Sequence, residues 1–169
     1  MEKYNTLPTE ILMASETGCC PKFDPDRWDN KYFELDGVPM IKVTGRSILY
    51  VPFNIGSIMS KTQEIIDASG AGAKDKYLIL AHDVSPWKCD YYFMVAGPIE
   101  GQENVTLKGR FISKVYEGEF SAMKGWAKEM KQFVEEEGYG LKTLYSFYTT
   151  CPKCAKIYGK NYVVLLAEV

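Results

Sequence analysis

Two pairs of cysteines are the residues of this 169-residue chain whose type and spacing most clearly suggest chemistry. Cys19 and Cys20 are adjacent, whereas Cys151 and Cys154 share the C-x-x-C spacing that metal sites and dithiol redox sites use. Three interpretations stay open: unreactive packing thiols, a four-thiolate zinc site, and a redox or disulfide site. Neighbouring side chains diverge, which makes Cys19-Cys20 an awkward pair for one metal. Apart from this zinc, no cofactor is expected.

The surroundings of the second pair limit the redox interpretation. Cys151 follows an aromatic strand and opens a short turn-helix, so amide groups at the helix N-terminus would stabilise its thiolate. The parallel sheet with crossover helices that accompanies thioredoxin-like sites is missing from the pattern. The odd number of cysteines, five, also argues against a disulfide framework.

Acid-base chemistry has fewer candidates. His82, the only histidine, precedes Asp83 without a nucleophile motif nearby, which is typical of a solvated loop histidine. Glu117, beside a predicted turn, is a candidate base for hydrolysis of a strained or activated small molecule, with Tyr148 as acid or oxyanion donor. A solvated, outward-pointing Glu117 is the alternative.

Aromatic residues make up 14% of the chain, with 12 Tyr, 8 Phe and 3 Trp. Aromatic side chains beyond the needs of a core usually line a ligand cavity or an interface. Alternation along the strand from Leu144 to Tyr148 places Tyr145 and Tyr148 on opposite faces. One face should therefore pack in the core and the other line the cavity. The candidate ligand-binding residues are Tyr50, Trp87, Tyr92, Tyr116, Trp126, Tyr145, Tyr148 and Asn161.

The elements that must position these residues form a repeating series. Shifting the chain by 64 residues places Gly45-Arg46 on Gly109-Arg110 and Met59 on Met123. The predicted fold is α+β, a pseudo-twofold duplication of a strand-strand-helix-strand-strand module, with an antiparallel sheet and two main helices on one side. In the first module Asp36-Gly37 is a predicted turn between two strands.

The modules span about residues 31–98 and 104–169 of a single domain. The closing strand of the second module lies 71 residues after its counterpart in the first module, whereas the other elements are offset by 64. The second module has therefore gained about seven residues, which form the turn and short helix that hold Cys151 and Cys154. The apolar run Val163–Leu166 requires cover on both faces. Residues 1–30 are an N-terminal extension that Phe23 and Trp28 hold against the body.

Charge and hydropathy limit the classes of partner that this chain can bind. The net charge is -2 and the chain has no run of Lys and Arg, which argues against nucleic-acid binding. No apolar stretch reaches the roughly 18 residues of a spanning helix, and the N-terminus lacks the apolar core of a signal peptide. We therefore expect a cytoplasmic protein with a small-molecule partner and no membrane partner; the oligomeric state is left open.

The second half of the chain resembles the GyrI-like (gyrase-inhibitor-like) small-molecule-binding family. The resemblance rests on Val115–Met123, Trp126, Met130, Phe133-Val134, Gly138, Tyr145–Tyr148 and Asn161–Ala167. It implies two modules around an aromatic-walled pocket, in a family of stand-alone proteins, effector domains that bind organic cations, and hydrolases that open cyclopropane-containing toxins. Asn161 stands where that family usually has a glutamate. A subgroup with paired cysteine motifs is often labelled hydrolase.

The predicted function is binding of a small, largely apolar or aromatic molecule in a pocket between the two modules. Hydrolysis by Glu117 and a tyrosine is the first alternative. A cysteine-based zinc or redox protein is the second.

Overall fold

The structure, a computed structural model, describes residues 1–11 and 15–169. In this part of the chain it contains eight strands and three α-helices, and most strand pairs are antiparallel, which confirms the α+β class. The chain divides into two compact units. Unit 1 consists of Met1–Asp36 and Gly109–Val169, and unit 2 of Gly37–Lys108.

Unit 2 is an antiparallel sheet with one helix. The second half of β2 (Lys31–Ile48) pairs with β5 (Lys88–Met94), which pairs with β4 (Ile79–Ser85). The two-residue β3 (Val51–Pro52) folds back on the end of β2. Helix α1 (Ile55–Ser69) buries Ile58, Thr62 and Ile66, which lie four residues apart on one face, and it ends at Gly70 in the left-handed conformation.

The predicted turn at Asp36-Gly37 is wrong, because β2 runs without a break from Lys31 to Ile48. Gly37 has a φ of +152°, a conformation that residues with a side chain rarely adopt. The glycine therefore accommodates a local change of backbone conformation inside one strand, where Asp-Gly usually signals a hairpin. The same happens in β6 (Glu103–Glu117), where Gly109 has a φ of +124° and two predicted strands are one.

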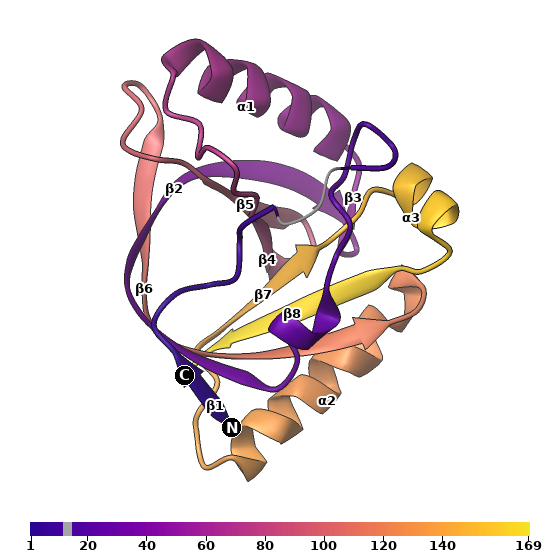
Figure 1. The fold of residues 1–169 in the computed structure, drawn as a ribbon. Coiled ribbons are helices and arrows are strands. Elements are labelled where there is room, and N and C mark those ends of the chain that lie inside the picture. Colours follow the sequence, from indigo (N-terminus) through magenta and orange to yellow (C-terminus); the bar gives the residue numbers. More distant parts are fainter. Residues whose placement is uncertain (12–14) are drawn as a thin grey trace. The chain divides into compact units, whose positions relative to one another are not determined.

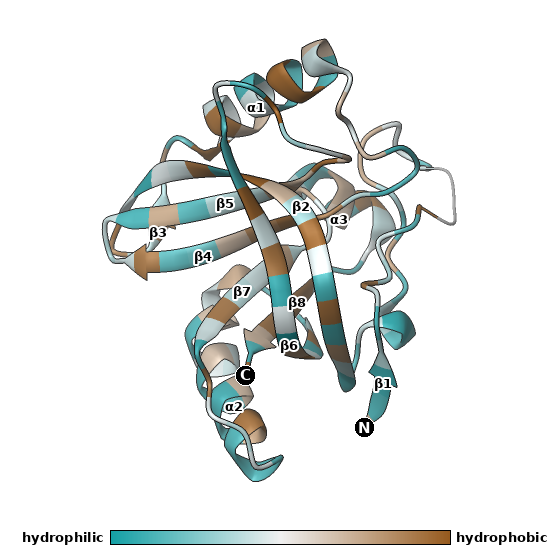
Figure 2. Cartoon of the chain, turned by 90° about the vertical axis from the view of Figure 1, so that its left-hand side faces the viewer, coloured by the Kyte–Doolittle hydropathy of each residue, from teal (hydrophilic) through white to brown (hydrophobic). Residues whose placement is uncertain are grey.

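The core of unit 1 is a three-stranded antiparallel sheet covered by a helix. Strand β8 (Tyr162–Glu168) lies between β6 and β7 (Thr143–Tyr148), and α2 (Met123–Glu136) runs along one face of these strands (Figure 1). Met130 and Val134 of α2 pack on Val163 and Leu165, and all four side chains are fully buried. The expectation that the closing strand is covered on both faces is confirmed, and Figure 2 shows apolar residues mixed with polar ones along its neighbours β6 and β7.

The N-terminal segment covers the opposite face of this sheet. Trp28 is buried, with its ring centroid 5.5 Å from that of Phe147 and 5.9 Å from that of Phe33, and Phe23 lies 6.2 Å from Phe147. The hydroxyl of Ser113 on β6 donates a hydrogen bond to the carbonyl of Trp28. Phe23 and Trp28 thus both contact Phe147 of β7. A short parallel strand, β1 (Glu2–Tyr4), pairs with Lys31–Phe33.

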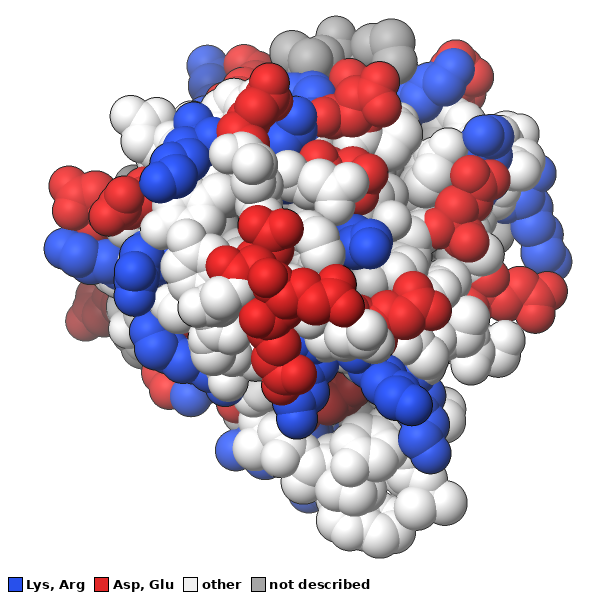
Figure 3. All heavy atoms as spheres, turned by 90° about the horizontal axis from the view of Figure 1, so that it is seen from below, with Lys and Arg blue, Asp and Glu red and all other residues white. Residues whose placement is uncertain are grey.

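The order of elements repeats, with one long strand in place of each predicted pair of strands before the helix. Strand, helix, strand, strand describes β2–α1–β4–β5, apart from the short β3, and again β6–α2–β7–β8. The second series contains an extra helix, α3 (Pro152–Tyr158), between β7 and β8, where the sequence predicted an inserted turn-helix. No helix in the described part of the chain is long and apolar enough to cross a membrane. Acidic and basic side chains are interspersed on the face shown in Figure 3.

Candidate functional site

Four aromatic rings gather where β6 ends and α2 begins, and we call them the aromatic end of unit 1. The rings of Tyr116 and Trp126 are stacked with centroids 5.4 Å apart, and those of Phe120 and Tyr148 meet edge to face at the same distance. Tyr116 and Tyr148 are brought level by β8, because both pair with Val163. Phe120, in the 3-10 turn Phe120–Ala122, keeps 41% of its surface exposed.

Asn161 lies at the same end, one residue before β8. Its side-chain amide donates a 2.7 Å hydrogen bond to the carbonyl of Gly118, and the amide of Gly118 donates to the carbonyl of Asn161 at 3.1 Å. Gly118 packs against Trp126 so closely that a Cβ there would lie 3.1 Å from Cζ2 of the indole. Asn161 thus fixes the turn that carries the backbone past the Trp126 ring.

Two oxygens of this site are buried without a hydrogen-bond partner among the described residues. They are the hydroxyl of Tyr116 and Oδ1 of Asn161. Burial also raises the pKa of Tyr116 well above its usual range, so the hydroxyl keeps its proton and can donate as well as accept. Because buried polar groups are nearly always hydrogen-bonded, two unpartnered oxygens at one end of a sheet require an explanation.

The other predicted ligand-binding residues lie elsewhere. Tyr145 is on the opposite face of β7 from Tyr148, with its ring 6.4 Å from that of Phe111. Tyr50 and Trp87 are more than half exposed in unit 2, where the amide of Tyr50 bonds to the carbonyl of Pro86, and Tyr92 is half-buried on β5. The structure therefore brings together four of the eight candidates: Tyr116, Trp126, Tyr148 and Asn161. The pocket between the two modules stays a prediction.

The acid-base candidates have contrasting surroundings. Glu117 is exposed, and its carboxylate lies 3.6 Å from the ammonium of Lys160, also exposed. Tyr148 is half-buried against Phe120. His82 lies on β4, opposite Asp90 of β5, so it is a strand residue rather than the predicted loop residue. Glu117 and Tyr148 sit at the same end of the sheet because Glu117 follows Tyr116.

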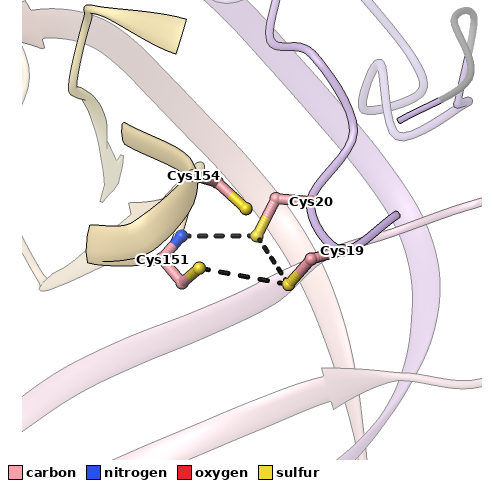
Figure 4. A group of neighbouring side chains, drawn as sticks. All are labelled: Cys19, Cys20, Cys151 and Cys154. Atoms are coloured by element: carbon pink, nitrogen blue, oxygen red, sulfur yellow. Dashed lines mark hydrogen bonds between the residues drawn. The ribbon is translucent and has the colours of Figure 1, made fainter. Parts of the chain in front are cut away.

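The four cysteines named from the sequence meet in unit 1 (Figure 4). Their sulfur atoms all lie within 4.8 Å of one another. Sγ of Cys19 is 3.7 Å from that of Cys20 and 4.0 Å from that of Cys151. The adjacent pair, whose side chains were expected to diverge, converges here because residues 15–20 form a tight turn in which the hydroxyl of Ser15 accepts a bond from the amide of Cys19.

Hydrogen bonds to sulfur hold this cluster. The amide of Cys151, which immediately precedes α3 as predicted, donates to Sγ of Cys20 at 3.3 Å. The hydroxyl of Thr17 lies 3.2 Å from Sγ of Cys154, and this bond and one with the backbone of Cys20 lower the pKa of the buried Cys154 thiol to about 6. Burial raises the pKa of Cys20 instead. Sulfurs with opposite pKa shifts thus lie side by side.

Three residues at these sites were not among the predicted site residues: Phe120 and Gly118 at the aromatic end and Thr17 at the cysteine cluster. The first two lie within Val115–Met123, a segment that carries the family resemblance, and a glycine before an acidic residue and an aromatic one at the end of an apolar strand was their local signal. Thr17 is 137 positions from Cys154, so no local pattern could have paired them.

Solved structures with a similar fold come from Listeria innocua. A hydrolase from that organism shares 14% sequence identity with this chain, covering 82% of it and 90% of the other, with a TM-score of 0.56. A conserved protein of the same organism covers 82% and 91% at 13% identity, with a TM-score of 0.55. At these identities the likeness concerns the fold alone. No curated protein sequence matches this chain.

A family model identifies the chain more directly. The model described as "Bacterial hydrolase" matches residues 12–169, nearly the whole length. The match and the fold of the relatives fit the resemblance to GyrI-like proteins, and the subgroup with paired cysteines stays a prediction. The chain belongs to the Bacterial hydrolase family.

Proposed function

We propose that the chain binds a small, largely apolar or aromatic molecule at the aromatic end of unit 1. The observation that carries this proposal is the pair of buried, unpartnered oxygens on Tyr116 and Asn161, beside four rings. A ligand that donates a hydrogen bond to Oδ1 of Asn161 and exchanges one with the Tyr116 hydroxyl would satisfy both.

The rings would supply most of the affinity. Phe120 and Tyr148 present an edge-to-face pair, and the exposed part of Phe120 gives a planar ligand a surface to stack on. Aromatic contacts contribute about 0.5–1.5 kcal/mol beyond the apolar area that they bury. The oxygens would then fix orientation, since a few placed polar groups among apolar walls give a site its specificity.

The proposal is tested with the neutral dye Nile red, titrated into the full chain and followed by dye fluorescence and by quenching of tryptophan emission. Phe120→Ala is expected to weaken binding about tenfold, which corresponds to about 1.4 kcal/mol. Phe53→Ala is the matched control, because Phe53 is 60% exposed in unit 2 and lies outside the proposed site. Equal affinity of Phe120→Ala and wild type would remove the aromatic end as the binding site.

The family match favours a second function, hydrolysis of a strained or activated small molecule at the same end of the sheet. Glu117 would act as the base toward water and Tyr148 as the acid or oxyanion donor. Tyr148 is one of the four rings of the proposed binding site, and the exposed Glu117 follows Tyr116 and has access to water.

Turnover of p-nitrophenyl acetate by the purified chain tests this second function. Glu117→Gln is expected to lower kcat by at least about a hundredfold, the usual contribution of a general base. Glu119→Gln, an exposed carboxylate two positions away, should leave kcat unchanged. If Glu117→Gln and Glu119→Gln turn over the ester equally, Glu117 is not the base, while the binding proposal is unaffected.

A further inference from the structure

The arrangement of the four sulfurs in unit 1 is that of a metal site. In a tetrahedral site with bonds of about 2.3 Å from zinc to sulfur, neighbouring sulfurs are about 3.8 Å apart. The distances of 3.7 Å from Cys19 to Cys20 and 4.0 Å from Cys19 to Cys151 match this edge, and the remaining ones stay within 4.8 Å. Small adjustments of side-chain torsions would bring all four to one centre.

Packing alone gives little reason for the cluster. Helix α3 buries a single residue, Cys154, while Ile157 on the same helix stays 59% exposed. The segment that supplies Cys19 and Cys20 has no helix or strand between residues 15 and 23. These two segments thus meet through sulfur atoms rather than through an apolar core. A bond between the sulfur atoms would supply the anchoring that neither segment obtains from packing.

The contacts around the sulfurs suit thiolates. Sγ of Cys20 accepts from the amide of Cys151, and Sγ of Cys154 lies beside the Thr17 hydroxyl. Donors aimed at sulfur offset the negative charge of a tetrathiolate centre and orient its ligands. The hydroxyl of Tyr158 donates to the carbonyl of Cys20 at 2.7 Å and fixes the first ligand pair on α3.

We propose that Cys19, Cys20, Cys151 and Cys154 bind one Zn²⁺ as four thiolates, tying residues 15–20 to helix α3. Four soft sulfur ligands in a tetrahedron select zinc over magnesium or calcium. With four protein ligands the coordination shell is closed, so the ion is structural and activates no water. Each thiol loses its proton to solvent as the ion binds, and no redox change is involved.

The test is zinc analysis by mass spectrometry of the full chain, purified without chelator and without a histidine tag. Wild type is expected to carry one zinc per chain. The double variant Cys151→Ser/Cys154→Ser should contain at least about tenfold less zinc per chain than wild type. Cys89→Ser is the matched control and should keep it, because Cys89 is a buried cysteine of unit 2, outside the cluster.

A second measurement does not depend on the folding of a variant. Cobalt titrated into chelator-treated wild type should give the intense sulfur-to-cobalt charge-transfer and tetrahedral ligand-field absorption of a tetrathiolate, displaced by one equivalent of zinc. Wild type without zinc and without these bands would overturn the proposal and leave packing thiols. Disulfides among the four cysteines in zinc-free wild type would also overturn it, in favour of the redox interpretation, as would equal zinc in wild type and the double variant.

Discussion

The hydroxyl of Tyr116 allows a test in which stability and binding should change in opposite directions. Tyr116→Phe keeps the ring stacked on Trp126 and removes only an oxygen that is buried without a partner among the described residues. A buried hydroxyl without a hydrogen bond costs about 1–3 kcal/mol. In the ligand-free chain the substitution should therefore raise the free energy of unfolding by about 1–2 kcal/mol, or Tm by about 2–4 °C per kcal/mol at this size.

Urea unfolding of the ligand-free chain, followed by tryptophan fluorescence, measures the first effect. Titration with a ligand selected for tight binding to wild type measures the second. Losing one neutral hydrogen bond of about 0.5–1.5 kcal/mol should weaken that ligand between about twofold and twelvefold.

Tyr158→Phe is the matched control, because it removes a hydroxyl that donates a 2.7 Å hydrogen bond to the carbonyl of Cys20. It should lower the free energy of unfolding by about 0.5–1.5 kcal/mol. If Tyr116→Phe lowers it equally, the Tyr116 hydroxyl is hydrogen-bonded in the ligand-free chain, and the reasoning behind the proposed site fails.

Three further predictions concern packing and reactivity. Met130→Ala should lower the free energy of unfolding in urea by about 2–5 kcal/mol, because the side chain is fully buried under α2; a loss below 1 kcal/mol, by the same scale, would contradict this packing. Gly118→Ala should cost on the order of 1–3 kcal/mol in the same assay, since its φ is +148° and Trp126 is close, whereas Gly125→Ala in open space on α2 should stabilise by about 0.5–1 kcal/mol. Burial raises the pKa of Cys89 to about 12, so at pH 8 iodoacetamide should alkylate it about a thousandfold more slowly in the native than in the unfolded chain, and equal rates would refute its burial.

The sequence determined the parts of this protein that depend on local periodicity. The run Val163–Leu166 could only be a strand covered on both faces, and its side chains are fully buried. Alternation along β7 separated Tyr145 from Tyr148, and the structure keeps them on opposite faces. Each of these followed from the period of two in a strand, which fixes direction without knowledge of any partner.

The tertiary structure alone decided what depends on partners far away in the chain. Asp36-Gly37 has the local chemistry of a turn, yet β2 continues through it, pairing with β1 on one side of this dipeptide and with β5 on the other. Cys20 bonds to the amide of Cys151, 131 positions later, and nothing in either motif specifies that separation. The local pattern determines the face on which a side chain lies, whereas the packing of the whole unit determines which segments meet. The four cysteines could therefore be identified from the sequence, but their proximity could not be predicted from it.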